Sequence, residues 1–526
     1  MHTIGIDVGT GSARAGVFDA QGRLLASAKR AITLWQDAGD VVEQSSDQIW
    51  AAICSAVREA VAAAGIAAAD VAGIGFDATC SLVAVKADGA PVSVSASGDA
   101  QRNIIVWMDH RAAGEAAEIN AGTHAVLRYV GGRISPEMET PKLLWLQRNL
   151  PASFAAADHF FDLADYLTWR ATGSLARSVC TVTCKWTYLA HEGRWDAAYF
   201  RAIGLGVLAD EGFVRIGTDI VDPGTALGQG LTPAAAADLG LLAGTPVGAA
   251  LIDAHAGGVG TLGGRIAGQA DGVGGRLAYI FGTSACAMAS TVGPVFVKGV
   301  WGPYFSAMVP GLWLNEGGQS AAGAAIDHLI AMHPTAGEAA RLAEDMPLVA
   351  WLEGQAAGVT GDGLHVVPEF LGNRSPLADP DARAVIAGLG LDTSVDSLVR
   401  LYVAGLCGVA YGLRQLLKTF AADGIVIDVI VASGGAAASG FVRQVLADAT
   451  GVPVAVANTA EPVLLGAAML GAVAGGVQPS LLVAMGAMAG EYRVYMPAAG
   501  TRARHDRGYA GFEILQAAGR AVRDLA

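Results

Sequence analysis

The sequence predicts an α/β protein whose two domains face each other across a cleft. Its 526 residues exceed what one hydrophobic core commonly holds. A unit of buried strand, Gly/Thr turn and returning strand opens the chain and occurs again after residue 276. Past residue 397, helical and strand patterns alternate in the manner of α/β domains. We place the boundary before Asp253, which gives domains of residues 1–252 and 253–526.

The first domain is expected to open with three antiparallel strands, an amphipathic helix and a buried strand. These five elements are assigned in order to residues 3–8, 12–18, 23–33, 46–64 and 71–76. Within the helix, Ile49, Ile53 and Val57 recur at helical spacing and form one apolar face. The 70 glycines of the chain cluster at strand ends in this interpretation, where they permit close approach of a ligand.

The second domain is expected to repeat the strand–turn–strand unit and then to alternate helices and strands. The elements are assigned to residues 277–281, 282–284 (the turn), 285–291, 397–417 (helix), 425–432, 440–449 (helix), 452–456 and a terminal strand and helix within 493–526. Residues 462–490 contain no charge, long enough to suggest a membrane span. Because Gly475-Gly476 and Gln478-Pro479 interrupt them, they are interpreted as two buried helices.

Composition and charge exclude several classes of protein. The net charge is −14 and lysines and arginines form no stripe, which argues against a nucleic-acid partner. Six cysteines without a CxxC pair indicate a reducing compartment. The N-terminal residues lack the basic and apolar regions of a signal peptide. We therefore expect a cytoplasmic protein that binds neither nucleic acid nor membrane.

Two Gly/Thr turns are candidate phosphate-binding sites. Glycine turns present backbone N–H groups with no side chain in the way, and hydroxyls add further donors. The expected phosphate contacts are Gly9, Thr10, Gly11 and Ser12 in the first turn, and Gly282 and Thr283 in the second. Asp7, at the end of the first strand, could hold Mg²⁺ through water. The alternative is that each motif is an ordinary hairpin with a solvated aspartate. Neither turn matches the GxxxxGK[ST] pattern.

A third glycine motif follows the strand at 425–432. Gly434, Gly435 and Ala436 stand between this strand and the next helix. A flat ring such as adenine can lie against backbone at such a place. The alternative is a plain strand-to-helix turn with helix-capping residues.

Asp253 is the candidate catalytic base. It comes directly after an apolar strand and before small residues, where a cleft floor would lie. Phosphoryl transfer to an alcohol needs a group that takes the hydroxyl proton, and a positioned carboxylate contributes roughly 10²–10⁴-fold. The alternative is a helix N-cap, for which aspartate is well suited. His255 is interpreted as structural, because no second histidine or cysteine stands at ligand spacing.

The ordered set of motifs resembles the FGGY family of carbohydrate kinases over essentially the whole chain. These motifs are GIDVGTGSARAGVFD, GFDATCSLV, WMDHRA, PKLLWL, IDAHAG, FGTSAC, NEGGQSAAG, GNRSPLADP and ASGG. The resemblance implies two ribonuclease H-like domains of the actin/hexokinase/Hsp70 superfamily, with sugar bound mainly by the first and ATP mainly by the second. It also implies ATP and Mg²⁺ as cofactors, Asp253 as the base, and a homodimer by the habit of relatives.

Within the family, two motifs are similar to the ribulokinase branch. They begin at Phe76 and Trp107, and the Thr79-Cys80-Ser81 run is similar to D-ribulokinases in particular. By this similarity the sugar contacts are expected at Ala78, Thr79, Asp109, Lys185, Asp253 and Glu316. The alternatives are that Lys185 is a surface charge and Glu316 a helix cap. Cys80 is interpreted as a packed residue, since nothing in its motif would activate a thiol.

The resemblance implies ATP-dependent phosphorylation of a ketopentose, D-ribulose to D-ribulose 5-phosphate. L-Ribulose, xylulose, ribitol and glycerol stay open as other acceptors. A second class is an actin- or Hsp70-like ATPase that switches partner binding, against which the polar loops at Asp77, Asp109 and Lys185 argue. A sugar sensor without activity is a third reading, against which the intact Asp7, Asp253 and both turns argue.

Overall fold

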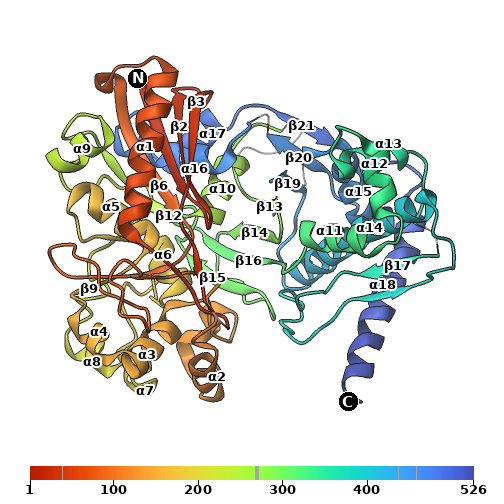
Figure 1. The fold of residues 1–526 in the computed structure, drawn as a ribbon, viewed down its shortest axis with the longest axis horizontal. Helices are drawn as coiled ribbons and strands as arrows, with labels where there is room; N and C mark the ends of the chain where they lie inside the picture. The colour runs from red at the N-terminus through yellow and green to blue at the C-terminus, as the bar shows by residue number, and fades with distance from the viewer. Residues whose placement is uncertain (38, 267–271, 362, 436–437, 458, 526) are drawn as a thin grey trace.

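The computed structural model describes residues 1–37, 39–266, 272–361, 363–435, 438–457 and 459–525. It consists of two α/β halves that lie beside each other, with the N-terminal strands in one half and the C-terminal helix at the far edge of the other (Figure 1). The predicted α/β class with two domains is thereby confirmed.

Each half is built on a sheet whose central strands follow the same order. The first sheet has the order β12-β6-β1-β2-β3 and the second β15-β16-β14-β13-β19-β20-β21. Their bounds are β1 (His2–Val8), β2 (Ser12–Asp19), β3 (Leu24–Ala31), β6 (Val71–Ala78), β12 (Val247–Ile252), β13 (Arg276–Phe281), β14 (Ala285–Thr291), β15 (Trp301–Phe305), β16 (Trp313–Gln319), β19 (Val429–Ser433), β20 (Val454–Ala457) and β21 (Tyr492–Tyr495).

The internal symmetry indicated by the two strand–turn–strand units extends to five strands. In the first half, the neighbouring strands β1, β2 and β3 pair in antiparallel fashion, whereas β6 and β12 run parallel to β1. In the second half, β13, β14 and β16 are antiparallel, while β19 and β20 are parallel to β13. Since parallel strands end at one edge of a sheet, β1 and β6 bring Asp7 and Asp77 to neighbouring positions.

A smaller five-stranded sheet and several helices complete the first half. The sheet consists of β4 (Trp35–Gln36), β5 (Val42–Gln44), β7 (Leu82–Val85), β8 (Ile104–Ile105) and β9 (His159–Asp162), and a further pair is β10 (Arg177–Ser178) with β11 (Ile220–Val221). The helices are α1 (Ser46–Ala64), α2 (Ala113–Ala121), α3 (Glu139–Asn149), α4 (Pro151–Ala156), α5 (Leu163–Thr172), α6 (Val179–Lys185), α7 (Ala197–Ala202), α8 (Gly206–Asp210) and α9 (Pro233–Leu239).

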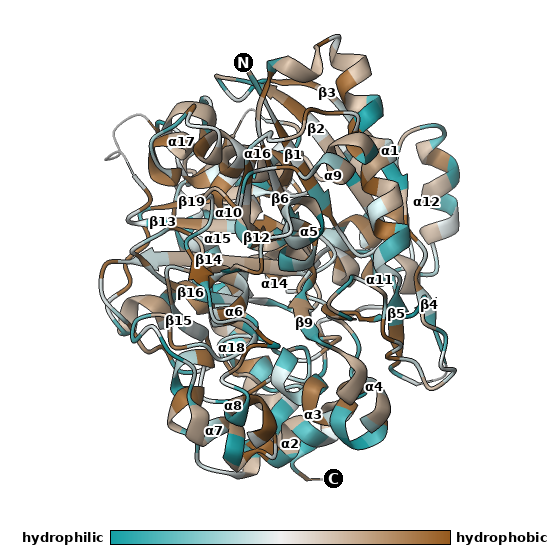
Figure 2. Cartoon of the chain, turned by 90° about the vertical axis from the view of Figure 1, so that its left-hand side faces the viewer, coloured by the Kyte–Doolittle hydropathy of each residue, from teal (hydrophilic) through white to brown (hydrophobic). Residues whose placement is uncertain are grey.

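The predicted amphipathic helix, α1, has the bounds that the sequence indicates. Ser45 caps its first turn by accepting a hydrogen bond from Gln48 N, and Gly65 ends it in the left-handed conformation. Ile49, Ile53 and Val57 are buried. Hydrophilic residues occur along one side of the peripheral helix α1, whereas β14 is largely hydrophobic (Figure 2).

The second half carries the longest helix of the described chain. Its elements are α11 (Gly323–Met332), α12 (Ala336–Ala343), α13 (Leu348–Gln355), β17 (His365–Val367), β18 (Val385–Ala387), α14 (Val395–Ala422), α15 (Gly440–Thr450) and α18 (Arg502–Arg523). By length and composition α14 could cross a membrane, but 67% of its apolar window is buried inside the protein, as in a core helix.

The uncharged segment forms two helices, α16 (Pro462–Ala474) and α17 (Leu481–Met488), as predicted. Together with α10 (Asp253–Leu262), α16 fills the space between the two large sheets (Figure 1). It packs on β1, β6 and β12 of the first sheet, although it follows β20 in the chain, while α10 packs on β13 of the second. The two helices therefore join the halves around the end of β12, where Asp253 lies.

Glycines inside the strands allow this packing. A Cβ at Gly75 would lie 1.9 Å from the carbonyl oxygen of Ala467, and one at Gly73 would lie 2.1 Å from that of Gly471. Likewise, a Cβ at Gly260 would meet the carbonyl oxygen of Pro462 at 1.9 Å. The expectation that glycines cluster at strand ends was therefore incomplete: many lie where the backbone of α16 presses on a sheet or a helix.

Candidate active site

A cavity of about 280 Å³ opens at the junction of the two halves. Its walls come from the β1–β2 turn, the end of β6, α6, the start of α10, the β13–β14 turn and β16. The lining residues are Asp7, Gly9, Thr10, Arg14, Thr79, Cys80, Trp107, Glu137, Lys185, Ile252, Asp253, Ala254, His255, Ile280, Ser284, Cys286, Trp301, Glu316, Arg374 and Val463. Polar side chains distant in sequence thus converge on one concave site, the usual form of a small-molecule site.

Asp253 lies in this cavity at the first position of α10. The N-cap residue of α10 is Ile252, and Asp253 Oδ1 accepts a hydrogen bond from the adjacent Ala254 N at 2.7 Å. Asp253 is thus not the N-cap residue itself, although its side chain satisfies a first-turn N–H group of α10. Burial, followed by the nearby negative charge of Asp7, raises the pKa of Asp253 to about 6. A carboxylate with a pKa just below neutrality is suited to accept a proton.

Asp7 forms an ion pair with an arginine, and a second, buried aspartate lies next to it on the neighbouring strand. Arg14 Nε donates to Asp7 Oδ2 at 2.6 Å, and Arg14 Nη1 pairs with Glu461 at 2.8 Å. Asp77, fully buried on the neighbouring strand, has its pKa raised well above the usual range by burial and by Asp7. The charged form of Asp77 is thus disfavoured beside the Asp7 carboxylate. The cavity wall thus carries two aspartates, Asp7 and Asp253, besides Glu137 and Glu316.

Each Gly/Thr turn is closed by a backbone hydrogen bond from its first glycine, and the second turn is one residue shorter than the first. Gly9 N donates to Ser12 O at 3.0 Å, and Gly282 N donates to Ser284 O at 2.9 Å. Thr10 Oγ1 accepts a hydrogen bond from Trp107 Nε1 at 2.9 Å, which leaves the hydroxyl proton of Thr10 for another acceptor. Gly9, Thr10 and Ser284 line the cavity, whereas Gly11, Ser12, Gly282 and Thr283 lie outside its lining.

The second turn is anchored to helix α11. Ala322 N donates to Thr283 O at 2.9 Å and Gly323 N donates to Gly282 O at 2.9 Å. A Cβ at Gly323 would lie 2.7 Å from that same carbonyl oxygen, so glycine permits the close approach. Thr283 is exposed at the tip of the turn.

The glycine motif after β19 lies beside the second turn. Gly434 has a φ of +91°, and a Cβ there would lie 2.6 Å from Phe281 O. Gly434 and Gly435 are both exposed and do not line the cavity. Ala436 lies outside the described residues.

The residues expected to contact the sugar divide into two groups. Thr79, Lys185, Asp253 and Glu316 line the cavity, and Ala78 is buried at the end of β6 directly before Thr79. Asp109 lies elsewhere: it is fully buried, and its oxygens accept hydrogen bonds from Val42 N at 2.7 Å and from Arg111. The WMDHRA motif reaches the cavity through Trp107 instead.

Lys185 and Glu316 are buried polar groups, not a surface charge or a helix cap. Lys185 is 8% exposed and Glu316 is 7% exposed. Although burial opposes it, nearby acidic groups, among them Cys80 and Glu316, raise the pKa of Lys185 well above its ordinary value. Lys185 Nζ and Arg374 each lie over the Trp301 ring, both at 5.5 Å from its centroid. These cations make one wall of the cavity positive.

His255 connects Glu316 to a buried cysteine behind the cavity. His255 Nε2 lies 3.3 Å from Glu316 Oε2, and its Nδ1 lies 3.0 Å from Cys180 Sγ. Against the effect of burial, Cys180 and Glu316 raise the pKa of His255, while the hydrogen bond from His255 lowers that of Glu316. His255 is thus a protonated link that keeps Glu316 ionised. Cys80 fits its interpretation as a packed residue, since burial raises the pKa of its thiol to about 12.

Several lining residues were not singled out from the sequence. This group consists of Arg14, Trp107, Glu137, Cys286, Trp301 and Arg374. His255 also lines the cavity, which was not expected. Arg14 stands within the first motif and Arg374 within GNRSPLADP, so the motifs themselves carried a signal.

The carboxylate oxygens in the cavity suit a Mg²⁺ ion that is also bound by phosphate oxygens. Among the described residues there is no group of three or more His, Cys, Asp or Glu side chains that could hold a metal by themselves. Mg²⁺ in phosphoryl-transfer sites commonly binds one or two carboxylates and completes its shell with phosphate oxygens and water. Asp7 offers such a carboxylate at the cavity wall.

The two domain models of one known family match the two halves of the chain. The family model described as "FGGY family of carbohydrate kinases, N-terminal domain" matches residues 2–260, and the corresponding C-terminal domain matches residues 277–475. An FGGY carbohydrate kinase domain-containing protein of Homo sapiens is 44% identical over 97% of this chain and 95% of its own length. A D-ribulokinase of Saccharomyces cerevisiae is 38% identical over 90% of this chain and 71% of its own.

Solved structures share the fold at low sequence identity. A xylulose kinase from Rhodospirillum rubrum superposes with a TM-score of 0.82 at 24% identity and covers 99% of both chains. Plasmodium falciparum glycerol kinase with ADP superposes with a TM-score of 0.78 at 16% identity and covers 97% of both.

Proposed function

The chain belongs to the FGGY family of carbohydrate kinases, and from that premise we propose that it transfers the γ-phosphoryl group of ATP to D-ribulose, giving D-ribulose 5-phosphate. The substrate is supported by the yeast relative named D-ribulokinase, 38% identical, and by bacterial relatives named ribulokinase, such as that of Shouchella clausii at 30%. The observation that carries the chemistry is the convergence of Asp7, Asp253, Lys185 and Glu316 on one cavity.

Asp253 serves as the base in this proposal. As the sugar hydroxyl oxygen forms its bond to the γ-phosphorus, the bond from that phosphorus to the bridging oxygen of ADP breaks, and the hydroxyl proton passes to the Asp253 carboxylate. A pKa of about 6 keeps most of the Asp253 population ionised at neutral pH while leaving it basic enough to take the proton. Arg14, bound to Asp7, stands next to the charge that develops on the phosphate.

The nucleotide is assigned to the two turns and the glycine motif after β19. Thr10, Gly11 and Ser12 are assigned as donors from one half and Thr283 from the other, while the N–H groups of Gly9 and Gly282 close the two turns. Adenine is assigned to the exposed backbone at Gly434 and Gly435. Mg²⁺ would be held by Asp7 together with phosphate oxygens, and its positive charge would stabilise the negative charge of the transferred group.

Sugar recognition is assigned to Thr79, Lys185, Glu316 and Asp253. Lys185 offers three N–H donors, and the ionised Glu316 accepts from hydroxyls. A site whose buried polar groups expect hydroxyls discriminates strongly against analogues that lack them. Asp109 is left out of this set, because its hydrogen bonds to Val42 and Arg111 hold it as a support of the loop that carries Trp107.

An ADP-release assay across candidate acceptors tests the proposal. D-Ribulose is expected to give the highest kcat/KM among D-ribulose, L-ribulose, D-xylulose, ribitol and glycerol. Highest kcat/KM for another acceptor would reassign the substrate within the family. ATP hydrolysis that is equally fast without any sugar would favour the ATPase-switch reading and overturn the kinase proposal.

Location and assembly stay predictions. All six cysteines are free, which suits a reducing cytoplasm. A homodimer is expected by analogy alone, and sedimentation at micromolar concentration would test it.

A further inference from the structure

A second and larger cavity lies in the other half of the molecule, away from the candidate active site. Its volume is about 630 Å³, within the range of about 300–1,000 Å³ typical of small-molecule sites. It lies between α14, α15, α18 and the segment that precedes β17. None of its lining residues lines the candidate active site. Nor does it include Gly434 or Gly435, assigned above to adenine.

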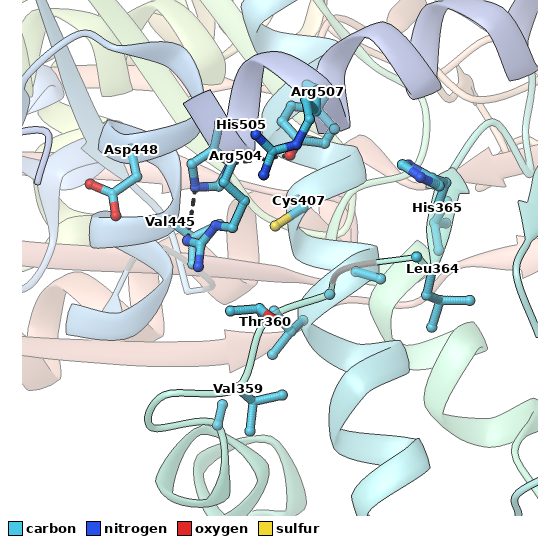
Figure 3. Close-up of a pocket in the computed structure, with 18 of the residues that line it drawn as sticks. Val359, Thr360, Leu364, His365, Cys407, Val445, Asp448, Arg504, His505 and Arg507 are labelled. Atoms are coloured by element: carbon cyan, nitrogen blue, oxygen red, sulfur yellow. Dashed lines mark hydrogen bonds between the residues drawn. The ribbon is translucent and has the colours of Figure 1, made fainter. Parts of the chain in front are cut away.

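One wall of this cavity is apolar and partly aromatic. Phe441 and Val445 come from α15, Val403 and Ala404 from α14, and Phe512 from α18. Val359 and Leu364 lie on the segment before β17, opposite α18 (Figure 3). Surfaces of this kind bind a flat or apolar body by burying its area.

The opposite wall carries positive charge. Arg504, His505 and Arg507 lie along the first turns of α18 and point to the cavity side (Figure 3). Arg504 Nη2 lies 3.2 Å from His505 Nε2, whose Nδ1 lies 3.1 Å from the Tyr411 hydroxyl. Among the described residues, no carboxylate forms an ion pair with Arg504 or Arg507. The N-terminal end of a helix adds partial positive charge at the same place.

Among the described lining residues, the acidic side chain of Asp448 is engaged by other groups. Asp448 Oδ1 accepts hydrogen bonds from Ala498 N at 2.7 Å and from Gln444 Nε2 at 2.8 Å. It thus ties α15 to the segment before α18, and within the described part of the chain neither arginine has a carboxylate partner. The cavity therefore combines an apolar slot with a cationic rim.

We propose that this cavity binds a small organic anion with a flat apolar body, which enters between Phe441 and Phe512 and places its anionic group at Arg504 and Arg507. The shared chemistry is that of an aryl phosphate or an aryl carboxylate. The site does not depend on the proposed kinase activity, since it shares no lining residue with the active-site cavity.

Direct binding to the full-length protein tests this inference. The probe is anilinonaphthalene sulfonate, a flat anion whose fluorescence rises in an apolar site. Replacing both Arg504 and Arg507 by Ala is expected to raise its Kd at least about tenfold, because two charge-assisted contacts are lost. Arg502→Ala is the control: it removes one positive charge from the start of the same helix, but Arg502 pairs with Asp506 and does not line the cavity.

Two further arms separate the parts of the proposal. Val445→Trp fills the apolar side and is expected to weaken the probe equally. Naphthyl phosphate and naphthoate are expected to displace the probe, and their relative potency distinguishes phosphate from carboxylate; naphthol, which lacks the charge, is expected to displace it at least about tenfold less well. Equal probe affinity in the double variant and the Arg502→Ala control would overturn the inference, as would displacement by naphthol as effective as by the anions. Because these experiments measure binding and not turnover, they test the inference even if the kinase assay fails.

Discussion

His255 Nε2 lies 3.3 Å from Glu316 Oε2, inside the lining of the active-site cavity. The bond joins α10, which begins with Asp253, to β16 of the second sheet. It fixes a carboxylate that we assign to the sugar. Cys180, on the other side of the imidazole, holds the ring from α6.

Replacing His255 by Gln should weaken sugar binding more than chemistry. Without the imidazolium, the pKa of Glu316 rises and its orientation is lost, so KM for the sugar is expected to increase about tenfold with a smaller change in kcat. Steady-state kinetics across a range of pH would measure both. His333→Gln, which removes a histidine that bonds Ser397 outside the cavity, is the control. An unchanged KM and pH profile in His255→Gln would show that the link has no functional role.

The pH dependence of kcat/KM should report Asp253. Its carboxyl must be ionised to accept a proton, and its pKa is raised to about 6 by burial and by Asp7. Activity is therefore expected to be full above this value and to fall about tenfold per pH unit below it. Asp88→Asn, which alters an exposed carboxylate, should leave the profile unchanged. A profile that stays flat down to the ordinary aspartate pKa would contradict the assignment.

Asp253→Asn should stabilise the fold at neutral pH. Because the folded pKa of about 6 exceeds the ordinary value of 3.8, ionising Asp253 costs the native state free energy above that window. The free energy of unfolding is expected to rise by about 1–3 kcal/mol in the variant. The gain should be full above the folded pKa and vanish below the unfolded one. Denaturant unfolding at several pH values would measure this gain in the free energy of unfolding. A loss of stability at neutral pH would contradict the raised pKa of Asp253.

Gly75→Ala should destabilise the junction between the first sheet and α16. Its Cβ would lie 1.9 Å from Ala467 O, a backbone atom that cannot yield without moving the helix. A loss of more than about 3 kcal/mol is expected from such overpacking. Gly293→Ala is the control, because a Cβ there meets nothing within 4 Å. Equal melting temperatures of the two variants would refute this account of the packing.

The regular elements could be predicted because their patterns are local. The strands β1 and β2, the turn before β14 and the spacing of α1 follow from neighbouring residues, and the structure confirms them. The interior glycines were not explained in advance, because their partner helix α16 is apolar on all sides and lies almost four hundred residues further along the chain.

The site was accessible from the sequence only in part. Asp7, Thr79, Lys185, Asp253 and Glu316 stood in motifs and do meet in one cavity. From the motif around Asp109, it is Trp107 that reaches the cavity. Periodicity does not show which side chain of an irregular loop points inward. His255 looked isolated because its partners, Cys180 and Glu316, come from α6 and β16, which only the folded topology brings together.

The most direct test is sugar-dependent ADP release by the wild-type protein and by Asp253→Asn, each with D-ribulose and saturating Mg-ATP. We predict turnover that requires the sugar in the wild type and a loss of about 10²–10⁴-fold in a variant that remains folded. Wild-type turnover in Asp253→Asn would contradict the account.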